Sequence, residues 1–181
     1  MQFNINESRF PCFLVMALLV VVVSPCLAEE DLETQVRQAV ERFQNAEPRA
    51  AELFERAYGY VVFPRIEKGA LIFGGAGGTG LVYENKTLVA QATMSHFTVG
   101  LQAGGGTYVE VIFFEDEATM AAFGKGDTIA SGQANAFGPH DAVSANASDR
   151  PGMVVFTMNR TGGFAEASAG AKSVRFHPLN P

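Results

Sequence analysis

A glycine-rich segment over residues 58–80 limits the folds open to this chain more than any other part of it. An apolar run ends at Pro64, a charged turn is predicted at 65–68, and a second apolar run covers 70–73. Five glycines then fall among residues 74–80. The pattern predicts strand, turn and strand, followed by backbone that needs positive φ or close approach of a neighbouring chain. The segment holds no nucleophile, carboxylate pair or metal-ligand set, which favours an architectural role over an enzymatic one.

The first 28 residues have the pattern of a secretory signal peptide. A weakly positive start at Arg9 precedes an apolar run over 10–23, which is too short for a comfortable membrane span. We predict cleavage after Ala28, which leaves residues 29–181 as a single domain. Two alternatives stay open. The segment is an uncleaved anchor helix, or Cys26 is the acylated residue of a lipoprotein, although the proline directly before Cys26 suits that signal badly.

The position of the cysteines excludes several kinds of site from the mature chain. Both cysteines, Cys12 and Cys26, lie in the predicted leader. Disulfides, thiolate nucleophiles and cysteine metal sites are therefore not expected in residues 29–181. A domain of this length buries roughly two thirds of its unfolded surface, which is enough for one core. Export without a eukaryotic sorting signal predicts a bacterial periplasmic or envelope-associated protein.

The charge balance argues against a nucleic-acid partner. The formal net charge is −6, whereas proteins that bind nucleic acids usually present a basic face. The acids concentrate in the middle of the chain, and residues 37–68 and 150–181 are relatively basic. If the partner is anionic lipid, these two basic segments are where it would dock.

The pattern of apolar residues and turn formers predicts an α+β domain. Apolar residues recur at helical spacing between Leu32 and Phe43, after a capping Asp31, and Pro48 suits the start of a second helix that ends at Ala57. A third helix over 117–123 follows Asp116 as its cap. We predict N-terminal helices packed on a twisted, mostly antiparallel sandwich or barrel-like sheet of short glycine-rich strands. The strands are expected at 60–63, 70–74, 79–83, 87–94, 97–103, 108–114, 127–134, 153–158, 163–169 and 173–176, with a loop over 139–151.

Motifs that suggest catalysis or cofactor binding lack their required context. The run from Gly75 to Gly80 matches GxGxxG, but a dinucleotide site needs a helix at the third glycine, and this chain continues as a predicted strand. Histidines 96, 140 and 177 are too far apart for a predicted metal site. An enzyme would be favoured only if Asp141, His140 and Ser95 met in one pocket. We therefore expect no enzyme activity, no nucleotide, no cofactor and no metal.

The order of several segments resembles the SYLF domain family. The segments are AYGYVVFP, KGALIFGGAGGTG, VGLQAGGGTYVEVIFF, an AFG helix end and a late GGF…AGA, and they run from about Asp31 to Phe176. SYLF domains are lipid-binding modules, also described as actin-binding domains in fungal members. The resemblance implies lipid binding associated with the N-terminal part of the domain and its basic residues. Phosphoinositides are the eukaryotic ligands, and a bacterial envelope offers phosphatidylglycerol, cardiolipin or lipid A. Actin binding does not carry over to a periplasm.

The predicted function is non-catalytic association with an anionic phospholipid membrane surface. The first helix either inserts its apolar stripe into a membrane interface or covers an end of the sheet, and its spacing is compatible with both. The alternative function is an envelope structural protein that binds a protein partner through a sheet edge or apolar groove. Resistance of binding to salt would favour this alternative. The predicted headgroup contacts are Arg37, Arg42, Arg49, Arg56, Arg65 and Lys68.

Overall fold

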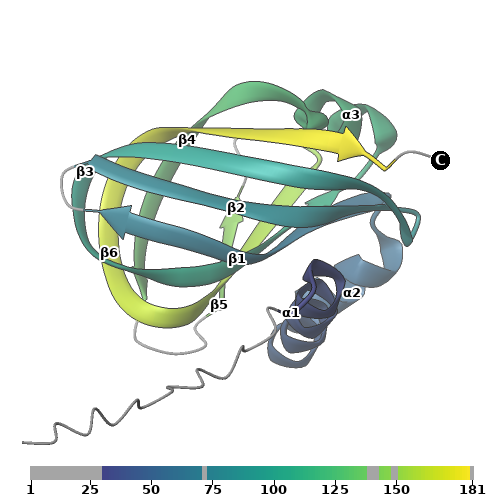
Figure 1. Cartoon of the computed structure of the whole chain (residues 1–181), viewed down its shortest axis with the longest axis horizontal. Coiled ribbons are helices and arrows are strands. Elements are labelled where there is room, and N and C mark those ends of the chain that lie inside the picture. The colour runs from purple at the N-terminus through teal and green to yellow at the C-terminus, as the bar shows by residue number, and fades with distance from the viewer. Residues whose placement is uncertain (1–29, 71–72, 138–142, 148–150, 180–181) are drawn as a thin grey trace, which may run out of the picture.

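The computed structural model describes residues 30–70, 73–137, 143–147 and 151–179, and it confirms the predicted α+β class. The predicted signal peptide lies outside these residues. Two helices precede a sheet of six strands, and a third helix separates two of the strands (Figure 1). The elements are α1 (Leu32–Ala46), α2 (Pro48–Arg56), β1 (Gly59–Ala70), β2 (Phe73–Glu84), β3 (Thr87–Phe114), α3 (Glu117–Gly124), β4 (Lys125–Phe137), β5 (Val143–Ala147) and β6 (Met153–Pro178).

The sheet is a set of nested antiparallel arches. The β1–β2 pair lies at the centre, and β3 runs along β2, bends, and returns along β1. Strand β6 follows β3 over both halves, and β4 and β5 pair with opposite halves of β6. We call β2, β4 and the parts of β3 and β6 beside them the β2 arm. The β1 arm consists of β1, β5 and the remaining halves of β3 and β6.

The bends of β3 and β6 gather at one end of the sheet, called the bend end (Figure 1). Gly104, at the bend of β3, has a φ of 113°, which favours glycine because it lacks a Cβ atom. The prediction of short strands was wrong here, since β3 has 28 residues and β6 has 26. Each long strand merges segments that were predicted separately, and Gly104, Gly105 and Gly106 of β3 lie within its ladder without ending it. Strand β5 also lies in the stretch predicted as a loop.

The predicted turn after Pro64 is instead a bulge inside β1. The pairing of β1 with both neighbours shifts register between Val62 and Ile66, and strand pairing resumes beyond this point. Proline has no N–H to donate to a ladder, so a bulge can hold it within a strand. Arg65 and Lys68 therefore lie on a strand. The turn after β2 was predicted correctly, and Asn85 has a φ of 47° there.

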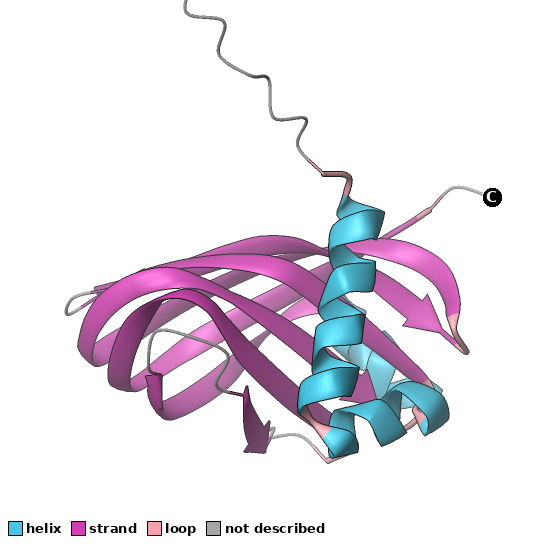
Figure 2. Ribbon diagram, turned by 90° about the horizontal axis from the view of Figure 1, so that it is seen from below, coloured by secondary structure: helices cyan, strands magenta, loops and turns pink. Residues whose placement is uncertain are grey.

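Two layers of apolar side chains hold the fold together. Helices α1 and α2 lie across the outer face of the sheet, where Val36, Phe43 and Phe54 are buried against Val62 and Phe113 (Figure 2). A second cluster fills the inside of the curled sheet and includes side chains of α3. The apolar stripe of α1 thus packs on the sheet. Among the described residues, no helix is long and apolar enough to cross a membrane.

Candidate functional site

The inside of the curled sheet carries an interior polar cluster. Glu110 is fully buried on the β1 arm, and Lys172 is 9% exposed on the β2 arm. The Lys172 ammonium donates to both carboxylate oxygens of Glu110, at 2.8 and 2.9 Å. This ion pair joins the two arms across the interior. The other buried polar residues of the cluster are Lys68, His96, Thr98, Thr157 and Asn159.

His96 is held neutral by its surroundings. Burial, together with the positive charges of Lys172 and Lys68, lowers its pKa to about 3. Removing an imidazolium from water costs free energy, and two nearby cations add repulsion. Because the imidazole stays uncharged in the folded protein, the unfolded chain binds a proton more readily at mildly acidic pH.

This pKa predicts a loss of stability on acidification. An unfolded histidine titrates near 6.5, so the unfolded state gains protons below that pH and the folded His96 does not until about pH 3. We expect the free energy of unfolding to fall by about 2 kcal/mol between about pH 7.5 and about pH 5 through this residue. Urea titrations at both pH values test this, with His96→Gln as the comparison. An equal fall in the variant would contradict the assignment.

A row of exposed basic and hydroxyl side chains crosses the outer face of the sheet. Backbone register places Arg65 opposite Thr79, Thr79 opposite Thr93, and Thr93 opposite Arg175, which also pairs with Lys125. Directly paired residues of neighbouring strands project to the same face. All five side chains are exposed. We call Arg65, Arg175 and Lys125, with the two threonines between them, the basic belt.

The outer face of the β2 arm is free of acidic residues at its described positions on β2, β3 and β6. On the side of the belt away from the bend end, His177 is exposed, and its Nε2 atom lies 3.1 Å from the Thr93 hydroxyl. Towards the bend end, the exposed positions become small and then apolar. The described outer positions from Leu81 towards the bend end are Gly75, Gly77, Thr79, Leu81, Gln91, Thr93, Ser95, Phe97, Val99, Ala171, Ser173, Arg175 and His177.

A second group of arginines adjoins the belt at Arg65. Arg160 donates from Nη1 to the Pro64 carbonyl oxygen at 2.9 Å. Partial burial lowers the pKa of Arg160, and the positive charges of Arg42 and Arg65 add to this effect. Arg65 and Arg160 line a hollow of about 550 Å³, to which Glu30 and Glu67 also contribute. The Glu67 carboxylate is 2.9 Å from the Arg65 guanidinium, and the negative charge of Glu30 opposes the lowering of the Arg160 pKa, so two acids balance the two arginines that line the hollow.

The structure separates the six predicted headgroup residues into several places. Arg42 and Arg65 come together beside Arg160, which the sequence analysis did not select. Lys68 is 8% exposed in the interior polar cluster, so the fold does not present it at the surface. The remaining three, Arg37, Arg49 and Arg56, are exposed on α1 and α2.

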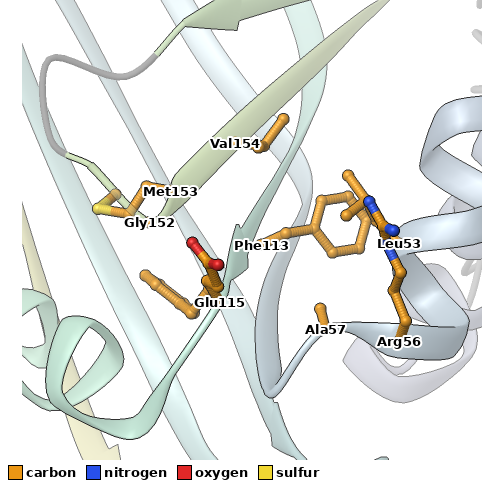
Figure 3. A pocket seen from close by; sticks show the side chains of 9 residues that line it. Leu53, Arg56, Ala57, Phe113, Glu115, Gly152, Met153 and Val154 are labelled. Carbon is orange, nitrogen blue, oxygen red and sulfur yellow. The ribbon is translucent and has the colours of Figure 1, made fainter.

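A further pocket of about 460 Å³ lies at the end of the sheet away from the bends. It opens between the end of α2, the end of β3 and the start of β6 (Figure 3). Leu53 and Arg56 line one side, and Glu115, Met153 and Val154 line the other (Figure 3). Most of the lining is apolar, and Arg56 and Glu115 are its two charged residues.

The motifs considered for catalysis are not assembled into a site in the described part of the chain. The GxGxxG match lies inside β2, and Ser95 is exposed on the outer face of β3. His140 and Asp141 lie outside the described residues. Asp116 caps α3, since its carboxylate accepts from the Thr119 amide at 2.8 Å. No group of three His, Cys, Asp or Glu side chains within the described residues is placed to hold a metal ion.

Sequence reasoning missed the belt because its members are far apart in the chain. Arg65 belongs to β1, whereas Lys125 and Arg175 were not selected. The available signal was the basic excess of residues 150–181, but a count of charges does not specify a face. The burial of Lys68 was missed because a bulge after Phe63 changes which residues of β1 point inward, and the other members of the interior cluster come from β3 and β6.

Comparison with known proteins gives a partial match. The chain is similar to Beta cell expansion factor A from Aeromonas veronii, with 31% identity over 139 residues. The match spans 76% of this chain and 52% of that protein, so the chain spans about half the length of this relative. No protein-family model matches the chain, and no solved structure matches it.

Proposed function

We propose that this protein is a non-catalytic module that associates with anionic phospholipid membranes. The observation that carries the proposal is the basic belt, in which Arg65, Arg175 and Lys125 share one exposed row of the sheet. A basic residue near an anionic membrane surface contributes about 1 kcal/mol of attraction. Three such residues give a weak association that salt reverses.

The neighbouring arginines extend this basic surface. Arg42 and Arg65 lie close enough to Arg160 for their charges to act on it, and guanidinium groups bind phosphate oxygens in a bidentate manner. A phosphate group of a lipid headgroup would relieve the repulsion among the three cations. The absence of acids on the described outer face of the β2 arm supports the same partner.

The proposed location follows from the leader and the resemblance to SYLF domains. An exported protein of this kind would act in the periplasm or at the envelope, at membranes rich in phosphatidylglycerol or cardiolipin. The module uses a sheet face for binding, while the buried face of α1 serves the core. Exposed arginines of α1 and α2 contribute only general charge.

Neutralising the belt should weaken membrane binding selectively. We expect Lys125→Gln with Arg175→Gln to raise the apparent Kd for vesicles of phosphatidylglycerol and phosphatidylcholine about thirtyfold, because two attractions of about 1 kcal/mol are lost. Co-sedimentation at low and moderate salt measures this effect. Binding to purely zwitterionic vesicles should be absent.

Arg49→Gln with Arg56→Gln is the matched control for the belt variant. It removes the same charge from exposed positions of α2, and we expect less than a threefold change in Kd. If the control loses binding and the belt variant keeps it, the docking surface is the helix pair. If the unmodified protein binds no vesicles, membrane association is wrong for this protein.

A protein partner is the second candidate function, favoured by the pocket in Figure 3. Within the described residues, β4 and β5 each pair only with β6 and form the two edges of the sheet. An edge strand or the pocket would bind a peptide through hydrogen bonds and apolar contacts that survive moderate salt. Salt-resistant capture of an envelope protein, with no vesicle binding, would favour this function.

A further inference from the structure

The outer face of the β2 arm exposes two large apolar side chains near the bend end. Phe97 is 55% exposed and Val99 is 46% exposed. They are neighbours on the outer face of β3, and the register pairs them with Ala171 and Ala169 of β6. Gly75 pairs with Phe97 from the other side. Phe97 thus lies between a glycine and an alanine, whereas Val99 lies between Ala169 and Phe73 of β2.

The inward face at the same level is polar. His96 and Thr98 alternate with Phe97 and Val99 along β3, and Lys172 pairs with His96. All three polar side chains are buried inside the curled sheet. This part of the β2 arm is therefore apolar outside and polar inside, which reverses the usual arrangement of a sheet that faces water.

The apolar pair and the basic belt are separated by a distance that suits a lipid leaflet. Ala171, the partner of Phe97, lies four positions along β6 from Arg175 in the belt. At about 3.3 Å per residue, this is about 13 Å, and Val99 lies about 20 Å from the belt. The hydrocarbon core of a bilayer is about 30 Å thick, so one leaflet is about 15 Å. A tilted sheet could thus place the belt at the headgroups and the pair among acyl chains.

We infer that the bend end of the β2 arm inserts into one leaflet of an anionic membrane. Phe97 and Val99 enter the acyl region, the basic belt lies among the phosphates, and helices α1 and α2 remain in water. The inference rests on the proposed function and specifies the face and depth of binding. The interior polar cluster is shielded from lipid by the wall that carries Phe97.

A bilayer fits this face better than a second copy of the chain does. Two copies that met through this face would bring their basic belts together, and like charges oppose such contact. A membrane with anionic headgroups neutralises the belt and buries the apolar pair in the same event. The serines of the intervening row, Ser95 and Ser173, are small polar residues suited to the boundary between headgroups and acyl chains.

The chain contains no tryptophan, so a single introduced tryptophan reports its own surroundings. We would compare Phe97→Trp with Gln44→Trp, which places the probe at an exposed position of α1. Each full-length variant is mixed with phosphatidylglycerol–phosphatidylcholine vesicles that carry bromine at defined acyl carbons. We expect Phe97→Trp to shift its emission to the blue and to be quenched by acyl bromine. Gln44→Trp should show neither change.

Three results would overturn the inference. If vesicles sediment the protein but the probe at position 97 stays in water, insertion is wrong and membrane association stands. If neither the variants nor the unmodified protein sediment with vesicles, both membrane association and insertion are wrong. If the probe at position 97 shifts to the blue without vesicles as the protein concentration rises, the face is an interface between copies.

A pair of apolar-to-polar variants tests the contribution of the inserted side chain. We expect Phe97→Ser to raise the Kd for the same vesicles about tenfold. Leu179→Ser is the matched control, since Leu179 is 47% exposed and lies beyond the belt on the side away from the bend end. Urea unfolding confirms that both variants are folded. Equal effects of the two substitutions would contradict the inference.

Discussion

Replacing Glu110 by alanine is expected to lower the free energy of unfolding by about 3–5 kcal/mol, the cost of breaking a buried ion pair. Glu110 is fully buried and accepts both contacts from the Lys172 ammonium. Without this carboxylate, Lys172 would remain in the interior near a second cation, Lys68, whose charge also acts on His96. The variant should also loosen the two arms, because the pair is a link between them across the interior. Urea unfolding followed by circular dichroism measures the loss.

Two further variants distinguish the loss of the buried ion pair from the effect that any substitution has on stability. Glu110→Met with Lys172→Met removes both charges and should recover most of the lost stability, since well-packed apolar residues replace buried pairs at little cost. Glu67→Ala breaks the ion pair between Glu67 and Arg65, in which the Arg65 side chain is 59% exposed and the Glu67 side chain is 70% exposed. This substitution should lower the free energy of unfolding by less than about 1 kcal/mol. A loss below 1 kcal/mol for Glu110→Ala would show that the interior pair is not structurally important.

Adding one methyl group at Gly80 should destabilise the protein by about 3 kcal/mol, at the upper end of the usual cost of overpacking. A Cβ atom at this position would lie 2.8 Å from the Phe63 ring and 3.0 Å from the Val62 carbonyl carbon, and closer still to the Val62 carbonyl oxygen. The approach is tight because Gly80 faces the bulge around Pro64, where β1 has extra residues. Backbone atoms in the middle of a sheet have little room to move.

Gly75→Ala is the control for Gly80→Ala on the same strand. A Cβ atom at Gly75 would meet no heavy atom within 4 Å, so we expect a change within about 0.5 kcal/mol. The melting temperatures of the two variants, measured by circular dichroism, should differ accordingly. Equal stability of the two variants would mean that the bulge shifts to accept the methyl group.

The helices were predicted from sequence because their signals are local. Asp31 caps α1 through the Thr34 amide at 2.8 Å, and Pro48 begins α2 as expected. The cap of α3 at Asp116 was also predicted. The lengths of β3 and β6 were not predicted, because a glycine can either end a strand or bend it. Which of these happens depends on neighbouring strands that are distant in sequence.

The prediction of the binding residues also depended on how distant strands pair, which the sequence does not show. Arg65 and Lys68 are three residues apart, and on a strand they point to opposite faces. Arg65 is exposed in the belt, whereas Lys68 is buried beside His96. The bulge around Pro64 sets which residues of β1 face inward, and the sequence showed Pro64 only as a stop.

The sequence by itself determined the α+β class, the three helices, the N-caps of α1 and α3, and the absence of cysteine after position 26. These properties depend on periodicity and composition, which act over a few residues. Only the tertiary structure decided how the sheet bends, which charges meet and which apolar residues stay exposed. Arg65, Lys125 and Arg175 form one row because antiparallel register aligns β1 to β6 across the sheet. Register depends on pairing between residues as far apart as Ala90 and Pro178, and no local pattern specifies it.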